Sequence, residues 1–220
     1  MSKFFLFGIL YWLLGNPLAA LLVLIVIVYI LDRRFIGLSP SFLRPLKRNR
    51  RLAAVRRELA ASPHNTSLKQ EAARILMEKK RWREAADYLE EIRPIMDDSP
   101  EVLADLGICR LKEGQLAEGE ALILESLEKN PRVKYGEPYL RLGEAYKMSD
   151  PDKALHYLQK IGEVNSSSCE AHYRQGQLYS QLGRKREAKE AYDEAVRLYR
   201  TLPKYKRKSE RRWALLARLK

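Results

Sequence analysis

The chain opens with one long apolar run, and short amphipathic segments follow it to the end. From residue 4 to residue 31 there are 28 consecutive positions without a charged side chain, interrupted by Gly15-Asn16-Pro17. Asn is a good helix N-cap and Pro suits the first helical position, so the pattern predicts a strong helix over residues 17–31. Such a helix would measure about 22 Å, which is short against a hydrocarbon core of about 30 Å.

The most economical arrangement of this run is a single membrane-crossing helix. We expect it to be kinked near Pro17 and to use part of residues 4–14, and an interfacial first half is the alternative. A cleaved signal peptide is a second alternative, but the run is too long for one and continues without polar relief. We therefore assign residues 1–34 to a transmembrane anchor, with residues 4–31 as its apolar part.

Basic residues follow the apolar run far more densely than they precede it. Residues 1–31 carry a net charge of +1, whereas residues 32–61 carry nine cations and two anions, a net charge of +7. By the positive-inside rule, the N-terminus should face outward and the rest should be cytoplasmic, as in a single-pass protein of the cell (inner) membrane. We interpret residues 35–65 as a basic juxtamembrane linker or helix, and we expect residues 32–61 to contact anionic lipid.

From residue 66 onward the sequence repeats itself with a period of about 34. Small residues recur at two fixed phases, which are Ala73, Gly107, Gly143 and Gly176, spaced 34, 36 and 33, and Ala85, Gly119, Ala154 and Ala188, spaced 34, 35 and 34. Each period reads as two amphipathic helices joined by a turn, and the small residues would let the two backbones approach closely. One such hairpin cannot bury its apolar face alone, so the units must stack.

The repeated motifs resemble the tetratricopeptide repeat (TPR). Leu106-Gly107 and Leu142-Gly143-Glu144-Ala145-Tyr146 match its first helix, and Ala188, Tyr192 and Ala195 match its second. We therefore expect an all-α fold, a TPR helical-hairpin solenoid preceded by one transmembrane helix. The repeats would span residues 66–202 as units 66–99, 100–133, 136–168 and 169–202, and residues 203–220 would form a basic C-terminal capping helix.

The resemblance also implies where a partner binds. In TPR proteins the first helices line a concave groove that holds a protein or peptide, and we expect the same here. The positions that this assigns to the groove are Gln70, Arg74, Met77, Ile108, Leu111, Lys112, Leu140, Glu144, Lys147, Tyr173, Gln177 and Gln181. For Ile108 and Leu140, packing of helix against helix is the alternative. The Lys and Asn clamp that some members use for acidic tails is absent, because other residue types stand at those positions.

The sequence offers no constellation for catalysis or for a cofactor. Cys169 and His172 lie three positions apart on an expected helix, but no second ligand pair follows at a matching spacing. It also contains no Gly-rich phosphate loop and no nucleophile elbow. We expect a non-enzymatic scaffold or adaptor at the membrane, without metal or cofactor. The alternative is that the basic flanks bind nucleic acid or anionic lipid and the repeats act as a spacer, although no recognised nucleic-acid motif is present.

Overall fold

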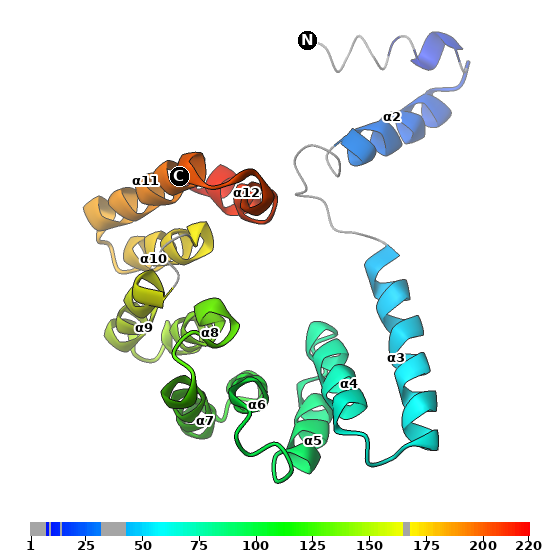
Figure 1. Ribbon diagram of the computed structural model, residues 1–220. Helices are drawn as coiled ribbons and strands as arrows, with labels where there is room; N and C mark the ends of the chain where they lie inside the picture. Colours follow the sequence, from blue (N-terminus) through cyan, green and yellow to red (C-terminus); the bar gives the residue numbers. More distant parts are fainter. Residues whose placement is uncertain (1–7, 9, 14, 32–42, 165–167) are drawn as a thin grey trace. The chain divides into compact units, whose positions relative to one another are not determined.

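The computed structural model describes residues 8, 10–13, 15–31, 43–164 and 168–220, and these fall into two compact units (Figure 1). The first unit covers residues 1–41 and the second covers residues 42–220. Residues 32–42, which include the end of the expected anchor and the start of the expected basic linker, lie outside the described residues.

The first unit contains helix α2 (Pro17–Leu31), which has 15 residues. Its expected start at Pro17 is confirmed, and the side chain of Asn16 accepts the backbone N–H of Leu18 at 2.9 Å. Just before it, Gly15 adopts a φ of +64°, so the apolar run bends there instead of continuing as one helix. The expected transmembrane helix is therefore not supported, because none of the described helices is both long and apolar enough to cross a bilayer.

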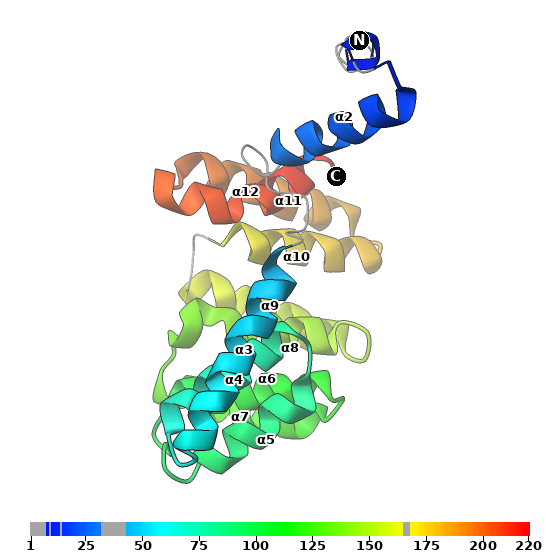
Figure 2. The same cartoon turned by 90° about the vertical axis from the view of Figure 1, so that its right-hand side faces the viewer.

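The second unit is built entirely of helices within its described residues. In chain order these are α3 (Leu43–Ala61), α4 (Thr66–Glu78), α5 (Trp82–Ile92), α6 (Pro100–Lys112), α7 (Leu116–Lys129), the short 3₁₀ turn η2 (Val133–Gly136), α8 (Glu137–Tyr146), α9 (Pro151–Val164), α10 (Cys169–Gln181), α11 (Lys185–Thr201) and α12 (Lys204–Arg218). Each helix packs against the next, so the expected all-helical solenoid is confirmed. Within this unit α4, α6, α8 and α10 follow the inner side of a curve, and α5, α7 and α9 follow its outer side (Figure 1). Figure 2 shows the unit from the side, with its helices stacked from α5 to α11.

Small residues let the two helices of a repeat pack closely. A Cβ atom on Gly143 of α8 would lie 2.7 Å from Cγ of Leu158 on α9. The same atom on Gly176 of α10 would lie 2.6 Å from the ring of Tyr192 on α11. Real Cβ contacts are longer, so at these positions the missing side chain is what lets the helices approach.

Polar side chains fix where the inner helices begin and how the repeats join. The side chains of Asn65, Ser99 and Ser168 cap α4, α6 and α10 by accepting backbone N–H groups. Between the second and third repeats, the carboxylate of Glu120 accepts hydrogen bonds from the hydroxyl groups of Tyr146 and Tyr157 and from Lys153 Nζ.

Helices α3 and α12 cover the two ends of the array. Leu52, Val55 and Leu59 of α3 are buried in the same cluster as Leu76 and Leu89 of the first repeat. Its arginines add ion pairs to the first repeat: Arg48 to Glu78, Arg51 to Glu71 and Arg56 to Glu84. At the other end, Ala217, Trp213 and Leu216 of α12 pack with the last repeat. Without such covers the end helices would expose an apolar face.

Candidate functional site

A pocket of about 710 Å³ opens on the inner side of the first three repeats. Helices α4, α6 and α8 form its walls, and the turn after α4 and the link η2 complete them. The lining side chains are Arg74, Met77, Glu78, Lys80, Trp82, Asp105, Ile108, Lys112, Lys134, Glu137 and Arg141. Five of these are cations and three are acids, so the pocket combines an excess of positive charge with an indole ring and aliphatic side chains.

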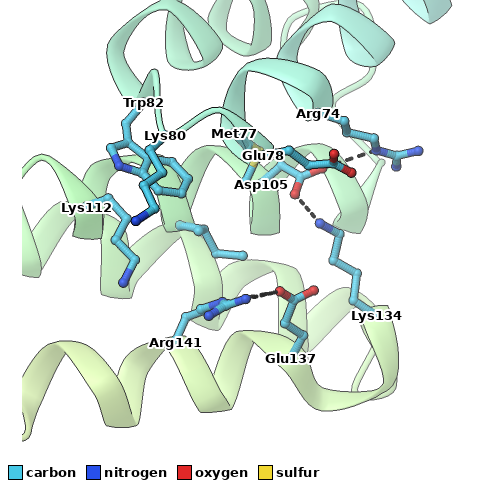
Figure 3. Close-up of a pocket in the computed structure, with 11 residues that line it drawn as sticks. Arg74, Met77, Glu78, Lys80, Trp82, Asp105, Lys112, Lys134, Glu137 and Arg141 are labelled. Carbon is cyan, nitrogen blue, oxygen red and sulfur yellow. Dashed lines mark hydrogen bonds and ion pairs between the residues drawn. The ribbon is translucent and has the colours of Figure 1, made fainter. Parts of the chain in front are cut away.

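Two clusters of side chains lie at different ends of the pocket (Figure 3). Lys80 and Lys112 lie close to Trp82 at one end, and Arg74, Asp105 and Lys134 cluster at the other. Glu137 and Arg141 of α8 face them from below in this view and form an ion pair of 2.7 Å. A bound segment would therefore meet an apolar and basic end and a more balanced, hydrogen-bonded end.

Asp105 is the anchor of the balanced end. Its side chain is only 1% exposed, and its carboxylate forms ion pairs with Lys134 Nζ and, at 3.5 Å, with Arg74 Nε. A buried carboxylate needs such partners, because burial without them would be costly. One cation comes from α4 and the other from η2, so Asp105 ties three segments of the pocket together.

Lys134 reaches Asp105 because of an unusual backbone. Lys134 and its neighbour Tyr135 have φ values of +47° and +55°, a conformation that L-residues other than Gly rarely adopt. These two residues fall between the expected second and third units, where the spacing from Gly107 to Gly143 is 36 instead of 34. The two extra residues thus form a tight link that directs the Lys134 side chain inward and leaves Tyr135 exposed.

Lys80 is a second residue with left-handed backbone at the pocket. It has a φ of +61° in the turn between α4 and α5. The corresponding turns of the second and fourth repeats carry Gly114 and Gly183, with φ of +88° and +74°. A lysine at this position costs conformational energy that a glycine would not, and such strain is often found at functional sites.

The last repeat identifies the fold. Residues 169–202 match the family model described as tetratricopeptide repeat. The array has the fold of a TPR solenoid. No curated protein shows a significant sequence match to the chain.

Solved structures, two of them described as TPR proteins, share this fold. The crystal structure of MamA superposes with a TM-score of 0.59 at 19% identity, over 73% of this chain and 96% of that one. YrrB, described as a TPR protein with an unusual peptide-binding site, gives 0.54 at 19% identity, over 81% of this chain and 87% of that one. TTC0263, a thermophilic TPR protein of Thermus thermophilus, gives 0.56 at 19% identity, over 77% and 91%. At these identities the likeness establishes the fold alone.

The residues expected to line the TPR groove divide into four groups. Arg74, Met77, Ile108 and Lys112 line the large pocket. Glu144, Lys147, Gln177 and Gln181 line a smaller hollow of about 150 Å³ between α8 and α10. Leu111, Leu140 and Tyr173 are buried in helix packing, and Gln70 is half-buried on α4 without bordering either hollow.

Burial separates packing from binding among these positions. Ile108 is only 3% exposed and Leu140 only 7%, so both pack against neighbouring helices. Each also borders a hollow, Ile108 the large pocket and Leu140 a further hollow of about 220 Å³. Arg74 is half-exposed at the large pocket, and its guanidinium lies 3.5 Å from the carboxylate of Asp105. Lys147 is exposed, so the two cations lie in different surroundings.

Other residues of the large pocket were not among the expected ones. Lys80 and Trp82 lie in and just after a turn, Lys134 lies in the two-residue insertion, and Arg141 is on α8 at a position that the groove pattern omits. The 36-residue spacing was the sequence signal for Lys134. Nothing in the repeat pattern marks Trp82, whose place in the pocket follows from the turn geometry.

The described histidines, thiols and carboxylates do not converge on a metal site. Within the part of the chain that the structure describes, no cluster of three or more His, Cys, Asp or Glu side chains could hold a metal ion. Cys109 and Cys169 are both buried and free, and burial raises the pKa of each thiol to about 12. Burial also lowers the pKa of His172.

Proposed function

We propose that this chain is a scaffold that binds a segment of another protein in the large pocket between α4, α6 and α8. The observation that carries the proposal is the composition of that pocket, with Met77 and Trp82 beside Lys80 and Lys112 and an excess of cations. A site of this kind suits a segment that places an apolar side chain next to a carboxylate. The TPR fold supports the same class of partner, because a curved helical array offers an extended inner surface.

Charge reversal at the basic end of the pocket tests the proposal. The full chain would carry a photo-crosslinking amino acid in place of Met77, in three backgrounds: unchanged, Lys80→Glu with Lys112→Glu, and Lys185→Glu with Lys189→Glu. The last pair is the matched control, because both lysines are exposed on α11, far along the chain from the pocket. We expect proteins crosslinked in the unchanged chain and in the control to be lost from the pocket variant.

The outcomes separate binding from folding. Circular dichroism must show the same helix content for all three chains. Equal capture by the pocket variant would contradict the proposal, and recovery of RNA or DNA in place of protein would support the alternative that the repeats are a spacer.

We further propose that the apolar N-terminal run tethers the scaffold to a membrane, with the repeats in the cytoplasm. What supports this is the composition of α2, which has no charged residue and exposes Leu18, Leu22 and Ile25, together with the dense cations that follow the run. A reporter fused after Lys220 should be active only in the cytoplasm. A C-terminus that external protease cleaves in intact cells would contradict the orientation.

Residues 32–61 remain our proposal for a lipid contact, with a narrower set of side chains. Arg48, Arg51 and Arg56 are paired with carboxylates of the first repeat, so they serve the packing of α3. Lys47 and Arg50 are exposed on the same helix and could reach lipid head groups.

A further inference from the structure

Helix α12 carries a basic and partly apolar face on the side away from its buried alanines. One of its cations, Arg212, also stands over the ring of Trp213, 5.3 Å from the ring centroid. At 100° per residue, Lys204, Lys208 and Arg212 project from one side of the helix, and all three are exposed. Tyr205 and Leu219 fall on this same side and are 84% and 81% exposed. The opposite side of α12 holds Ala214 and Ala217, which are buried, so the exposed face is distinct from the capping face.

The single acid of α12 is turned away from this face. Glu210 points toward the start of α10, where its carboxylate accepts the backbone N–H of Glu170 at 3.3 Å. Its removal from solvent raises its pKa, which is a sign of its inward position. The exposed face is therefore left with cations alone.

Two further arginines of α12 are also engaged elsewhere. Arg207 donates from Nε to the carbonyl oxygen of Leu202 at 2.7 Å and from Nη2 to that of Arg200 at 3.0 Å. Arg211 donates from Nε to the hydroxyl of Tyr199 at 3.4 Å. These contacts fasten α12 to the end of α11, so the helix is held with its other side outward.

The cations of the outward face differ from those of α3. The arginines of α3 that face the first repeat have carboxylate partners, whereas Lys204, Lys208 and Arg212 form no ion pair with a described carboxylate. A folded domain that needed these cations for stability would supply acids opposite them. Their arrangement in a row on a rigid helix instead suits an external surface of negative charge.

We propose that this face of α12, which we call the basic face (Lys204, Tyr205, Lys208, Arg212 and Leu219), docks on the surface of a bilayer rich in anionic phospholipid. The lysines and Arg212 would lie among the phosphate groups, and Tyr205 and Leu219 would enter the boundary between head groups and acyl chains. Exposed apolar side chains interleaved with cations favour lipid over nucleic acid, because a phosphate backbone offers no apolar layer for Leu219. The inference is independent of what the large pocket binds.

A label beside the basic face can report docking in the full chain. Ser209 is exposed at the edge of this face, and Cys109 and Cys169 are buried, so Ser209→Cys gives one reactive thiol for an environment-sensitive fluorophore. The labelled chain would be reconstituted in phosphatidylcholine vesicles that contain increasing phosphatidylglycerol and a nitroxide lipid quencher in the head-group region. We expect quenching to rise with phosphatidylglycerol. We expect it to fall when NaCl is raised from about 0.1 M to about 0.5 M, because salt screens the attraction between the cations and the lipid head groups.

Matched charge changes show whether the effect belongs to α12. Lys204→Glu with Lys208→Glu and Arg212→Glu should abolish the rise of quenching with phosphatidylglycerol. Lys185→Glu with Arg186→Glu and Lys189→Glu changes the net charge equally on exposed positions of α11 and should leave quenching intact. Because the first triple change could disturb folding, the glutamine version of it is measured beside it, and both must keep the helical circular dichroism of the parent.

Each remaining result overturns the proposal. Equal loss in the α11 variant would reduce the effect to overall charge. Quenching that is the same in pure phosphatidylcholine would show that charge has no part in it. A label that responds to a DNA or RNA duplex in detergent, but not to phosphatidylglycerol, would assign the basic face to nucleic acid.

Discussion

Gly107 and Gly119 face each other across α6 and α7 so closely that a Cβ on either would lie 2.8 Å from the carbonyl oxygen of the other. Both obstructing atoms belong to backbone, which cannot rotate away as a flexible side chain can. The contact joins the two helices of the second repeat at the middle of the solenoid. A side chain is therefore tolerated least at these two positions.

A side chain at Gly119 should force these helices apart. We expect Gly119→Leu to lower the free energy of unfolding by about 1–3 kcal/mol or more, because the helix pair must shift to admit it. Ala117→Leu, on the exposed side of the same helix, should stay within about 0.5 kcal/mol. Urea unfolding followed by circular dichroism measures both, and equal stability of the two variants would show that the contact can relax.

Replacing Lys80 with glycine should make the protein more stable but weaken its binding of a partner. Since the backbone at Lys80 is left-handed, we expect Lys80→Gly to raise the free energy of unfolding by about 0.5–1 kcal/mol. It should also weaken partner capture, because the cation beside Trp82 is gone. Lys79→Gly is the control: Lys79 has a φ of −87°, so glycine there brings no relief and should destabilise. A Lys80→Gly chain that is less stable than the parent would contradict the strain argument.

Asp105 and Lys134 should behave as a coupled pair. Asp105→Asn is expected to cost about 1–3 kcal/mol, less than for a fully buried pair because Lys134 and Arg74 keep some contact with solvent. Adding Lys134→Met should cost less than the sum of the two single changes. Strict additivity in a double-mutant cycle would show that the ion pair contributes nothing.

The Glu120 network should make the junction of the second and third repeats sensitive to acid. Burial would raise the pKa of Glu120, but the hydrogen bonds from Lys153, Tyr146 and Tyr157 together outweigh it and lower the pKa below its ordinary value of 4.5. A lowered folded pKa means that the contribution to stability is complete above the unfolded pKa and is lost as pH falls through the folded pKa.

Glu120→Gln tests the direction of this effect. At pH 7 it should lower the free energy of unfolding by about 1–3 kcal/mol, and the difference from the parent should shrink in acid, below about pH 4. Glu128→Gln, on an exposed position of the same helix, is the matched control and should stay within about 0.5 kcal/mol of the parent at pH 7. A difference that grows in acid would reverse the assigned sign.

The solenoid was predictable because its cause is periodic. Small residues at two phases demand paired helices, and pairs with apolar faces demand stacking, so residues such as Gly143 and Gly176 locate the helix contacts from sequence alone. The large pocket was only partly predictable. Arg74 and Lys112 follow from the repeat pattern, but Trp82 and Lys134 come from a turn and an insertion, whose geometry a periodic argument does not describe.

In the N-terminal run, the uncharged composition is plain from the sequence, but the position where the helix breaks is not. The absence of charge from residue 4 to residue 31 predicts a single crossing, yet the left-handed backbone at Gly15 leaves a helix of only 15 residues. A glycine before Asn and Pro fits both a kinked helix and a break, and the sequence has no further signal to separate them.

The two left-handed residues Lys134 and Tyr135 divide the array into modules that cannot be exchanged freely. Whole hairpins can be added to or removed from a solenoid only where the period is kept, because each interface is shared between neighbours. At this seam the period slips by two residues, and the slip is fastened by the bond from Lys134 to Asp105. Recombination that joined the second repeat to another chain's third would lose the seam, and with it one wall of the pocket.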